Sequence, residues 1–201
     1  MHGLILRTLQ MFLKDTYGVD VWTDIAANAD LGIAEFEAML SYDPSLLEAV
    51  LHAAENALER KRETILEDVG TYLVSHQNNE RLRRLLRFGG NDFIDFLLSL
   101  DDLPGRTRLA VPDLILPDLE LYEYSANEFA LCVIGPINGF GHVMVGVLRA
   151  MADDYGMLVL LDYNGRNGRC EKIAMSVIDA DYAEGREFFL AAPDASRSVL
   201  T

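Results

Sequence analysis

The chain has 201 residues, which suffices for one sizeable domain or two small ones with a hydrophobic core. It carries 32 acidic and 17 basic side chains, a net charge of −15, which argues against binding to a nucleic-acid backbone. No apolar run approaches the roughly 20 residues of a membrane-spanning helix, and the N-terminus lacks a secretory signal pattern. We therefore expect a soluble, cytoplasmic protein that binds neither nucleic acid nor membrane.

The first half of the chain shows the spacing of amphipathic helices. Apolar residues recur at helical intervals over 5–13, and Gly18 ends that pattern. The pair Asp43-Pro44 supplies a cap and a first-turn proline for a helix that begins at about residue 45.

Three further helices are predicted over 65–74, 82–88 and 91–100. Asn91 is the expected cap of the last one, and we expect Pro104 with its following glycine to end it.

After Pro117 the apolar spacing changes to the alternation of strands. Two strands within 119–133 flank the polar turn "SANE" and predict a hairpin. A helix follows over 141–155 and ends at Gly156. A second hairpin is expected around "NGRNG", because Asn-Gly pairs favour the backbone angles of tight turns.

Sequence motifs for catalysis are absent, so we expect no enzyme activity and no metal site. Cys132 and Cys170 lack metal-ligand spacing and are expected to be buried free thiols. The basic cluster 81–87 is interpreted as a solvated helix face, with docking to an acidic partner as the alternative. The adjacent acids Asp101/Asp102 and Asp153/Asp154 are expected at the surface.

The segment "GPINGFG", residues 135–141, is rich in glycine and precedes a helix. Such a helix N-terminus could hold an anion, but the glycine spacing is not that of a dinucleotide site and no basic residue accompanies it. A plain strand-to-helix turn is the favoured interpretation.

Taken in order, several segments resemble the H-NOX, or haem nitric-oxide/oxygen-binding, domains of bacterial gas sensors and soluble guanylate cyclases. The resemblance spans roughly residues 1–178, and the chain looks like a divergent stand-alone bacterial member. The segments that carry it are "MHGLI", "YGVDVW", "SYDPSLLEAV", "EDVGTYLV", "LLRFGGNDFIDFLLSLDDL", "VPDLILP" and "GHVMVGVLRAMADDYG".

The resemblance implies an α+β fold, with a helical N-terminal subdomain packed on a four-stranded antiparallel sheet and its helix. We expect a single H-NOX-like domain over 1–180, divided at about residue 65 into subdomains 1–65 and 66–180. Residues 181–201 are expected to form a C-terminal extension, either a short helix or a tail.

Members of the family hold haem iron by a histidine in the pattern "SLDNLH". Here the pattern reads "SLDDLP", so Pro104 stands at the ligand position, and neither Pro104, Gly105 nor Arg106 can ligate iron. The family also anchors the haem propionates by a Tyr-x-Ser-x-Arg motif. Counting back from Gly141 places that motif on Gly135, Ile137 and Gly139, which cannot serve as anchors.

A second register of the motif passes through Ser125 and reads Glu123, Ser125 and Asn127, which keeps the serine and loses the arginine. His142 and, more weakly, Cys132 are the alternative axial ligands by family topology. The remaining histidines are His2, His52 and His76. No haem and no other cofactor is therefore expected.

A pocket is nevertheless expected between the two subdomains. Its predicted wall consists of apolar residues from both of them: Ile5, Leu9, Leu97, Leu100, Pro117, Met144 and Leu148.

Three functions remain open. The first is an H-NOX-like signalling domain that has lost haem ligation and uses partners or another small apolar ligand. The second is a haem-binding gas sensor with an unusual axial ligand, and the third is a degenerate module kept for protein interaction. The resemblance implies a signalling partner in trans, either a histidine kinase or a cyclic-di-GMP enzyme.

Overall fold

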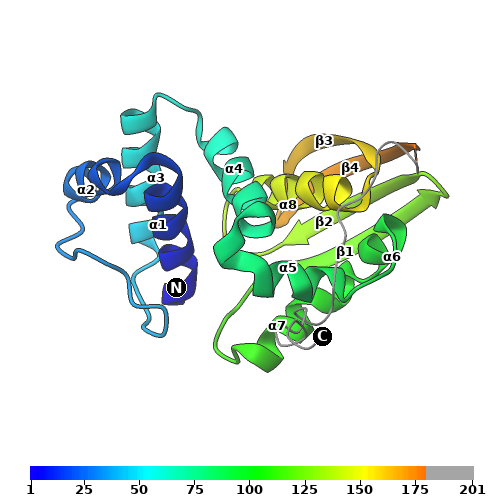
Figure 1. Ribbon diagram of the computed structural model, residues 1–201, viewed down its shortest axis with the longest axis horizontal. Helices are drawn as coiled ribbons and strands as arrows, with labels where there is room; N and C mark the ends of the chain where they lie inside the picture. The colour runs from blue at the N-terminus through cyan, green and yellow to red at the C-terminus, as the bar shows by residue number, and fades with distance from the viewer. Residues whose placement is uncertain (180–201) are drawn as a thin grey trace, which may run out of the picture.

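The computed structural model describes residues 1–179 and consists of two packed parts (Figure 1). Three helices, α1 to α3, form the N-terminal part, and a four-stranded sheet with its covering helices forms the other. The predicted extension 181–201 lies outside the described residues. Within the described part, no helix is long and apolar enough to cross a bilayer.

The predicted helices and hairpins occur in the predicted order, and α2 and α7 are present in addition. The helices are α1 (Gly3–Tyr17), α2 (Val19–Asn28), α3 (Ser45–Leu58), α4 (Arg62–Ser75), α5 (Glu80–Arg87), α6 (Phe93–Leu98), α7 (Leu103–Ala110) and α8 (Phe140–Tyr155), with the short 3₁₀ helices η1 (Gln77–Asn79) and η2 (Leu100–Asp102). The strands are β1 (Asp118–Ser125), β2 (Glu128–Ile134), β3 (Leu158–Asn167) and β4 (Cys170–Asp179).

Helix α1 forms one side of the N-terminal core. His2 caps it by accepting a hydrogen bond from the Leu4 N–H, and Gly18 ends it with a φ of +98°, an angle that favours glycine. Leu9 and Leu13 are buried in that core, whereas Ile5 is only half-buried. The stripe of α1 that packs inward is thus rotated slightly from the predicted one.

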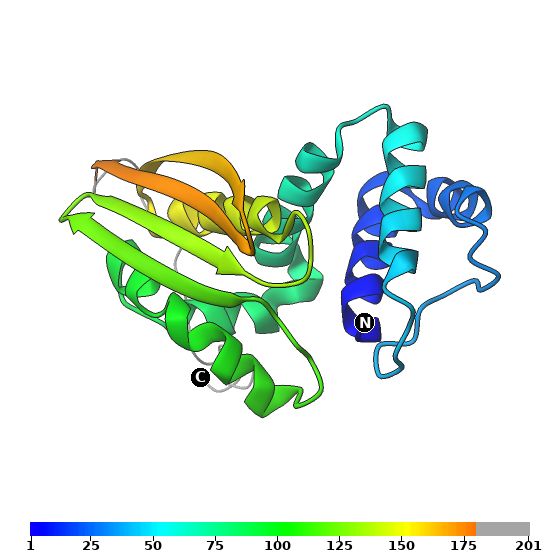
Figure 2. The ribbon, with the colours of Figure 1, turned by 180° about the vertical axis from the view of Figure 1, so that it is seen from behind.

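The sheet has the strand order β1-β2-β4-β3, and every neighbouring pair is antiparallel. Both predicted hairpins are therefore confirmed, and the second turns at Gly168, whose φ is +62°. Side chains alternate along β2, so Leu131 and Val133 point toward the core that α8 covers. Figure 2 shows the opposite face of the sheet, with α8 behind it.

Helices α4 and α8 cross with their backbones in contact. A Cβ built on Gly70 of α4 would overlap the Val143 carbonyl oxygen and lie 2.8 Å from the Val147 nitrogen. A Cβ built on Gly146 of α8 would likewise overlap the carbonyl oxygen of Glu67. The two glycines allow a helix approach that no larger residue permits.

Pro104 begins a helix and does not end one, so the predicted helix stop is wrong. Helix α6 ends at Leu98, η2 follows, and α7 starts at Leu103 with the proline in its first turn. A proline fits there because the first-turn N–H has no partner within the helix. The predicted cap of α6 is also displaced by one residue, since the Asp92 carboxylate accepts the Asp95 N–H at 2.8 Å.

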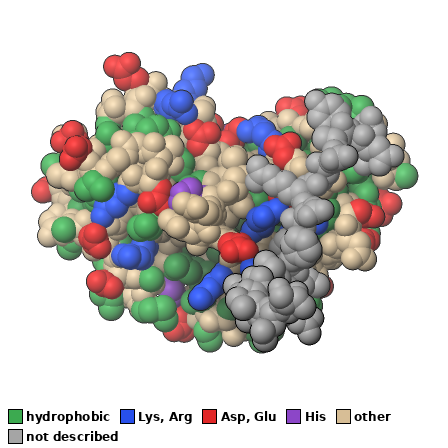
Figure 3. Space-filling view, viewed as in Figure 1, with side chains coloured by type: hydrophobic (Ala, Val, Ile, Leu, Met, Phe, Trp, Pro, Cys, Tyr) green, Lys and Arg blue, Asp and Glu red, His purple; other side chains and the backbone are tan. Residues whose placement is uncertain are grey.

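The basic helix α5 is held against the end of α8. The Arg83 guanidinium binds the Asp154 carboxylate with two hydrogen bonds of 2.8 and 2.7 Å, and Asp154 is only 3% exposed. Arg87 lies over the Tyr155 ring and donates to the Asp154 carbonyl oxygen. The predictions that Asp154 lies at the surface and that the basic face of α5 is fully solvated are therefore wrong. On the face seen in Figure 3, basic side chains alternate with acidic ones.

The glycine crossing predicts a stability test. Gly70→Ala should lower the free energy of unfolding by about 2–4 kcal/mol, because the added methyl group forces the two helix backbones apart. Gly105→Ala is a matched control, since a Cβ at this exposed position in α7 meets nothing within 4 Å. We expect the control to be neutral or stabilising by a few tenths of a kcal/mol. Urea denaturation measures both, and equal stabilities of the two variants would contradict the crossing.

Candidate functional site

Pro104, which the family resemblance predicts to occupy the iron-ligand position, is buried in the first turn of α7. Its nitrogen is part of a tertiary amide and offers no lone pair to a metal. The neighbouring Arg106 turns back toward α6 and donates from Nη2 to the Ser99 carbonyl oxygen at 3.0 Å. This position therefore supplies packing and no ligand atom.

The loop from Gly135 to Gly141 leads from β2 into the first turn of α8 and contains the three predicted motif positions. Gly135 lies against Pro117, because a Cβ on this glycine would meet the proline Cβ at 2.9 Å. Ile137 is half-buried and packs on the N-terminal core. Gly139 precedes α8 with a φ of +82°, in the left-handed region that favours glycine.

An internal carboxylate fills the N-terminus of α8. The Glu171 side chain on β4 is 2% exposed and accepts hydrogen bonds from the Gly139 N–H at 2.9 Å and the Gly141 N–H at 2.7 Å. Such N–H groups have no partner within the helix and attract anions. The predicted turn is thus confirmed, and the anion at its helix end belongs to the chain itself.

Two side chains from β3 complete this carboxylate site. The Tyr163 hydroxyl donates to Glu171 Oε2 at 3.2 Å, and Arg166 Nη1 lies 3.7 Å from Glu171 Oε1. Burial and the Glu171 charge raise the pKa of Tyr163 to about 12, so its hydroxyl remains a donor at neutral pH. Arg166 also donates to the Asn138 side chain. We call the group Tyr163, Arg166 and Glu171 the carboxylate clamp.

The alternative motif register lies at the other end of β2. Glu123, Ser125 and Asn127 are exposed residues of the first hairpin. The Ser125 hydroxyl accepts the Asn127 N–H at 3.4 Å, a contact that belongs to the turn itself. These residues and the loop before α8 therefore do not form one site.

The alternative axial ligands have other partners. His142 Nδ1 lies 3.3 Å from Glu67 Oε1, and its ring packs on Tyr163 with centroids 3.9 Å apart. This contact places His142 beside β3, whereas α7 with Pro104 packs against β1, the opposite edge of the sheet. Cys132 is bonded to Cys170, which contradicts the predicted free thiols, and a disulfide sulfur is no thiolate ligand.

The predicted pocket wall is divided between two cores. Leu97, Leu100, Met144 and Leu148 belong to the core under the sheet and are at most 4% exposed. Leu9 belongs to the N-terminal core. None of these residues, nor Ile5 or Pro117, lines either of the two cavities that lie between α1 and α4.

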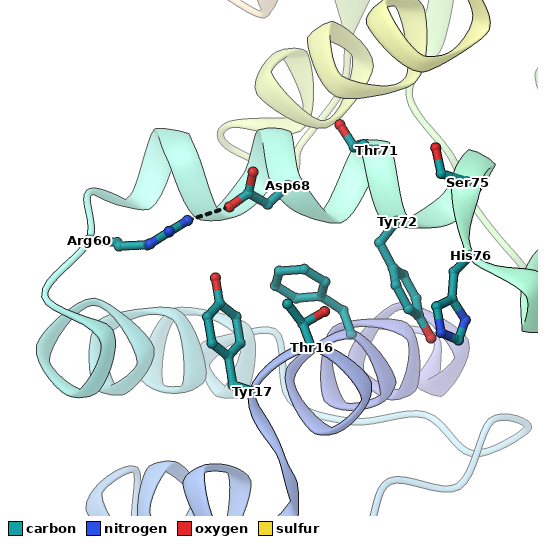
Figure 4. Close-up of a pocket in the computed structure, with 9 residues that line it drawn as sticks. Thr16, Tyr17, Arg60, Asp68, Thr71, Tyr72, Ser75 and His76 are labelled. Atoms are coloured by element: carbon teal, nitrogen blue, oxygen red, sulfur yellow. Dashed lines mark hydrogen bonds and ion pairs between the residues drawn. The ribbon is translucent and has the colours of Figure 1, made fainter. Parts of the chain in front are cut away.

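Two cavities lie between α1 and α4 and meet at Tyr72, and together we call them the α1–α4 groove. The larger measures about 430 Å³, and Figure 4 shows its aromatic lining and the ion pair of Arg60 with Asp68 at 2.8 Å. The smaller measures about 230 Å³. It is lined by Leu4, Arg7, Thr8, Met11, Tyr72, Asn78 and Asn79.

Tyr72 is fixed in this position by polar contacts. Its hydroxyl donates to Asp15 Oδ2 at 2.7 Å. The His76 ring stacks on the Tyr72 ring, with the two centroids 4.7 Å apart. Burial, with the bond to the Asp15 carboxylate, raises the pKa of Tyr72 well above its ordinary value. Among the described residues, no cluster of three His, Cys, Asp or Glu side chains could hold a metal ion. The lining of the groove thus combines aromatic rings and hydroxyl groups with the charged side chains Arg7, Arg60 and Asp68.

The sequence pattern of the Haem-NO-binding family matches residues 2–161. The chain belongs to this family of gas-sensor domains. Its fold resembles a mutant H-NOX protein from K. algicida in the unliganded Fe(II) state, with a TM-score of 0.75 and 18% identity over 90% of this chain and 99% of that one. The S. oneidensis H-NOX protein in its Fe(II)NO state gives a TM-score of 0.74 with 15% identity, over 89% and 100% of the chains. The predicted α+β H-NOX fold is thus confirmed.

The curated relatives include animal proteins. Soluble guanylate cyclase 89Da of Drosophila melanogaster is 21% identical over 163 residues, which cover 81% of this chain and 24% of the relative. Soluble guanylate cyclase gcy-31 of Caenorhabditis elegans is 21% identical over 154 residues, 77% of this chain and 22% of the relative. The chain spans about a quarter of the length of these relatives.

The carboxylate clamp predicts a second stability test. Glu171→Ala should cost about 2–4 kcal/mol of unfolding free energy, because it leaves the Gly139 and Gly141 N–H groups and Arg166 without their buried acceptor. Glu128→Ala is the matched control, since this exposed glutamate of β2 accepts the Ser176 hydroxyl at the surface of the sheet, and its effect should stay within about 0.5 kcal/mol. Thermal and urea denaturation measure the difference. Equal losses in the two variants would refute the clamp.

Proposed function

We propose that this chain is a signalling domain of the H-NOX family that works without the family's haem ligation. The observation that carries this proposal is Pro104, buried at the position of the proximal ligand and without an atom that can bind iron. The chain thus keeps the family fold around a residue that cannot bind iron.

The carboxylate clamp gives the proposal independent support. In the family, a tyrosine and an arginine near this helix bind the propionates of haem. Here Tyr163 and Arg166 hold Glu171, so a carboxylate of the chain stands where the N-terminus of α8 would receive one from a cofactor. A haem propionate would have to displace a buried group with four partners, which costs several kcal/mol. The residues present therefore do not fit haem bound in the family manner.

The packing of the predicted pocket wall agrees with this proposal. Leu97, Leu100 and Leu148 have no exposed surface and belong to the single core under the sheet. A porphyrin between them would have to separate these side chains and break their mutual close packing. If a ligand binds to this domain, we propose that it is a small molecule in the α1–α4 groove, whose lining includes the aromatic rings of Phe12, Tyr17 and Tyr72.

We propose further that the domain is not itself an enzyme and passes its signal to a separate cytoplasmic protein. A histidine kinase or a cyclic-di-GMP enzyme is the expected partner by resemblance to the family. In the two animal relatives, the matching segment is about a quarter of a soluble guanylate cyclase, so the same kind of domain occurs there within a signalling enzyme.

An absorbance spectrum tests the proposal. After expression with added haem precursor and passage through a desalting column, the purified protein should show no Soret band, because iron lacks its proximal ligand. A Soret band at one haem per chain would contradict the proposal. If such a band disappeared in His142→Ala and remained in His52→Ala, the proposal would be replaced by a haem-binding domain with His142 as its axial ligand. His52 is the control because its ring contacts Asn56 on the same exposed face of α3, away from the sheet.

A further inference from the structure

The two cysteines lie side by side on neighbouring strands. Cys132 near the end of β2 and Cys170 at the start of β4 have their Cα atoms 5.6 Å apart and form a disulfide. This Cα distance lies within the range that disulfides require. A dithiol and a disulfide can therefore interconvert here without moving the strands.

The pair is reachable from solvent on one side only. Along β2, Leu131 and Val133 point into the core, so Cys132 points to the opposite face of the sheet, which Figure 2 shows in front of α8. Cys132 is 7% exposed, whereas Cys170 is half-buried. A small thiol or disulfide in solution therefore meets Cys170 first.

The pair is also joined directly to the segment that positions α8. Cys170 is followed by Glu171, which holds the Gly139 and Gly141 N–H groups. Cys170 is preceded by Arg169, whose carbonyl oxygen accepts the Gly135 N–H at 3.3 Å. A covalent bond at Cys170 consequently restrains both sides of the loop from Gly135 to Gly141.

We propose that Cys132 and Cys170 are a reversible thiol–disulfide site, and that the site sets the mobility of the loop 135–141 according to the surrounding thiol pool. In a reducing compartment a disulfide is usually transient and redox-sensing. Proximity on two paired strands favours the intramolecular bond over a lasting adduct with a small thiol. The proposal goes beyond the loss of haem ligation and does not depend on it.

The oxidant is a small disulfide such as oxidised glutathione. The Cys170 thiolate attacks one of its sulfur atoms, forms a mixed disulfide and releases one glutathione thiolate. The Cys132 thiolate then attacks the Cys170 sulfur, closes the intramolecular bond and releases the second glutathione thiolate. Two protein thiols are oxidised, one glutathione disulfide is reduced to two thiols, and the two protons of the cysteines pass to them or to solvent.

The test equilibrates the native protein with mixtures of reduced and oxidised glutathione, quenches with acid, and alkylates the remaining thiols for mass spectrometry. We expect two alkylated cysteines in reducing mixtures, none in oxidising ones, and a reversible transition between them. Cys132→Ala should stop at the glutathione adduct on Cys170, and Cys170→Ala should react far more slowly. Failure to close the bond with excess oxidised glutathione would overturn the proposal. So would a bond that excess reduced glutathione leaves intact.

Hydrogen exchange of the same native samples tests the effect on the loop. Amides of residues 135–141 should exchange slower by roughly threefold or more in the oxidised protein, because the disulfide restrains both ends of their hydrogen-bond network. The hairpin turn 125–128 at the far end of β2 is the internal control and should be unchanged. Equal loop exchange in the two redox states would contradict the control of the loop by this pair.

Discussion

The contact between the backbones of α4 and α8 determines how the two parts of this protein meet. Gly70 and Gly146 leave no side chain at the crossing, so the helices touch at their main chains. Ile65 and Val69 of α4 pack into the N-terminal core, while Val147 of α8 packs under the sheet. Helix α4 thus belongs to both parts, and the α1–α4 groove lies on the side of α4 that faces α1.

A buried carboxylate lies at each end of helix α8, and the helix dipole favours one of the two charges and disfavours the other. At its N-terminus Glu171 accepts from free N–H groups, an arrangement that the helix dipole favours. At its C-terminus Asp154 is a charge that the dipole disfavours, and the two hydrogen bonds from Arg83 compensate it. This acidic chain therefore uses two of its arginines, Arg83 and Arg166, to compensate buried carboxylates. The same arrangement that fixes α8 also occupies the N–H groups at its N-terminal end.

Periodic spacing in the sequence predicts most of the elements, because helices and hairpins depend on neighbours close in the chain. Two of its errors concern contacts between distant residues. One is the ion pair of Arg83 with Asp154, and the other is the disulfide of Cys132 with Cys170. Both depend on how α5, α8 and the strands pack together, and local sequence patterns do not reveal that packing.

Pro104 shows a different limit, because a proline after an apolar helix is equally compatible with a helix stop and with the first turn of a new helix. One signal of the site is nevertheless present in the sequence: Glu171 falls on the inward side of β4, in phase with Ile173 and Met175. An acid at a core position needs partners, so this alternation is enough to indicate a buried carboxylate. The identity of its partners, Tyr163 and Arg166, depends on the pairing of β3 with β4.

The chain keeps the H-NOX fold while its own Glu171 accepts hydrogen bonds from the N–H groups at the start of α8. An amide NMR spectrum of the native protein, recorded as haem is added, tests this through the Gly139 and Gly141 signals. Both signals should stay at their original positions up to one equivalent of haem. Displacement of both signals, saturating at one haem per chain and accompanied by shifts around Pro104, would contradict it.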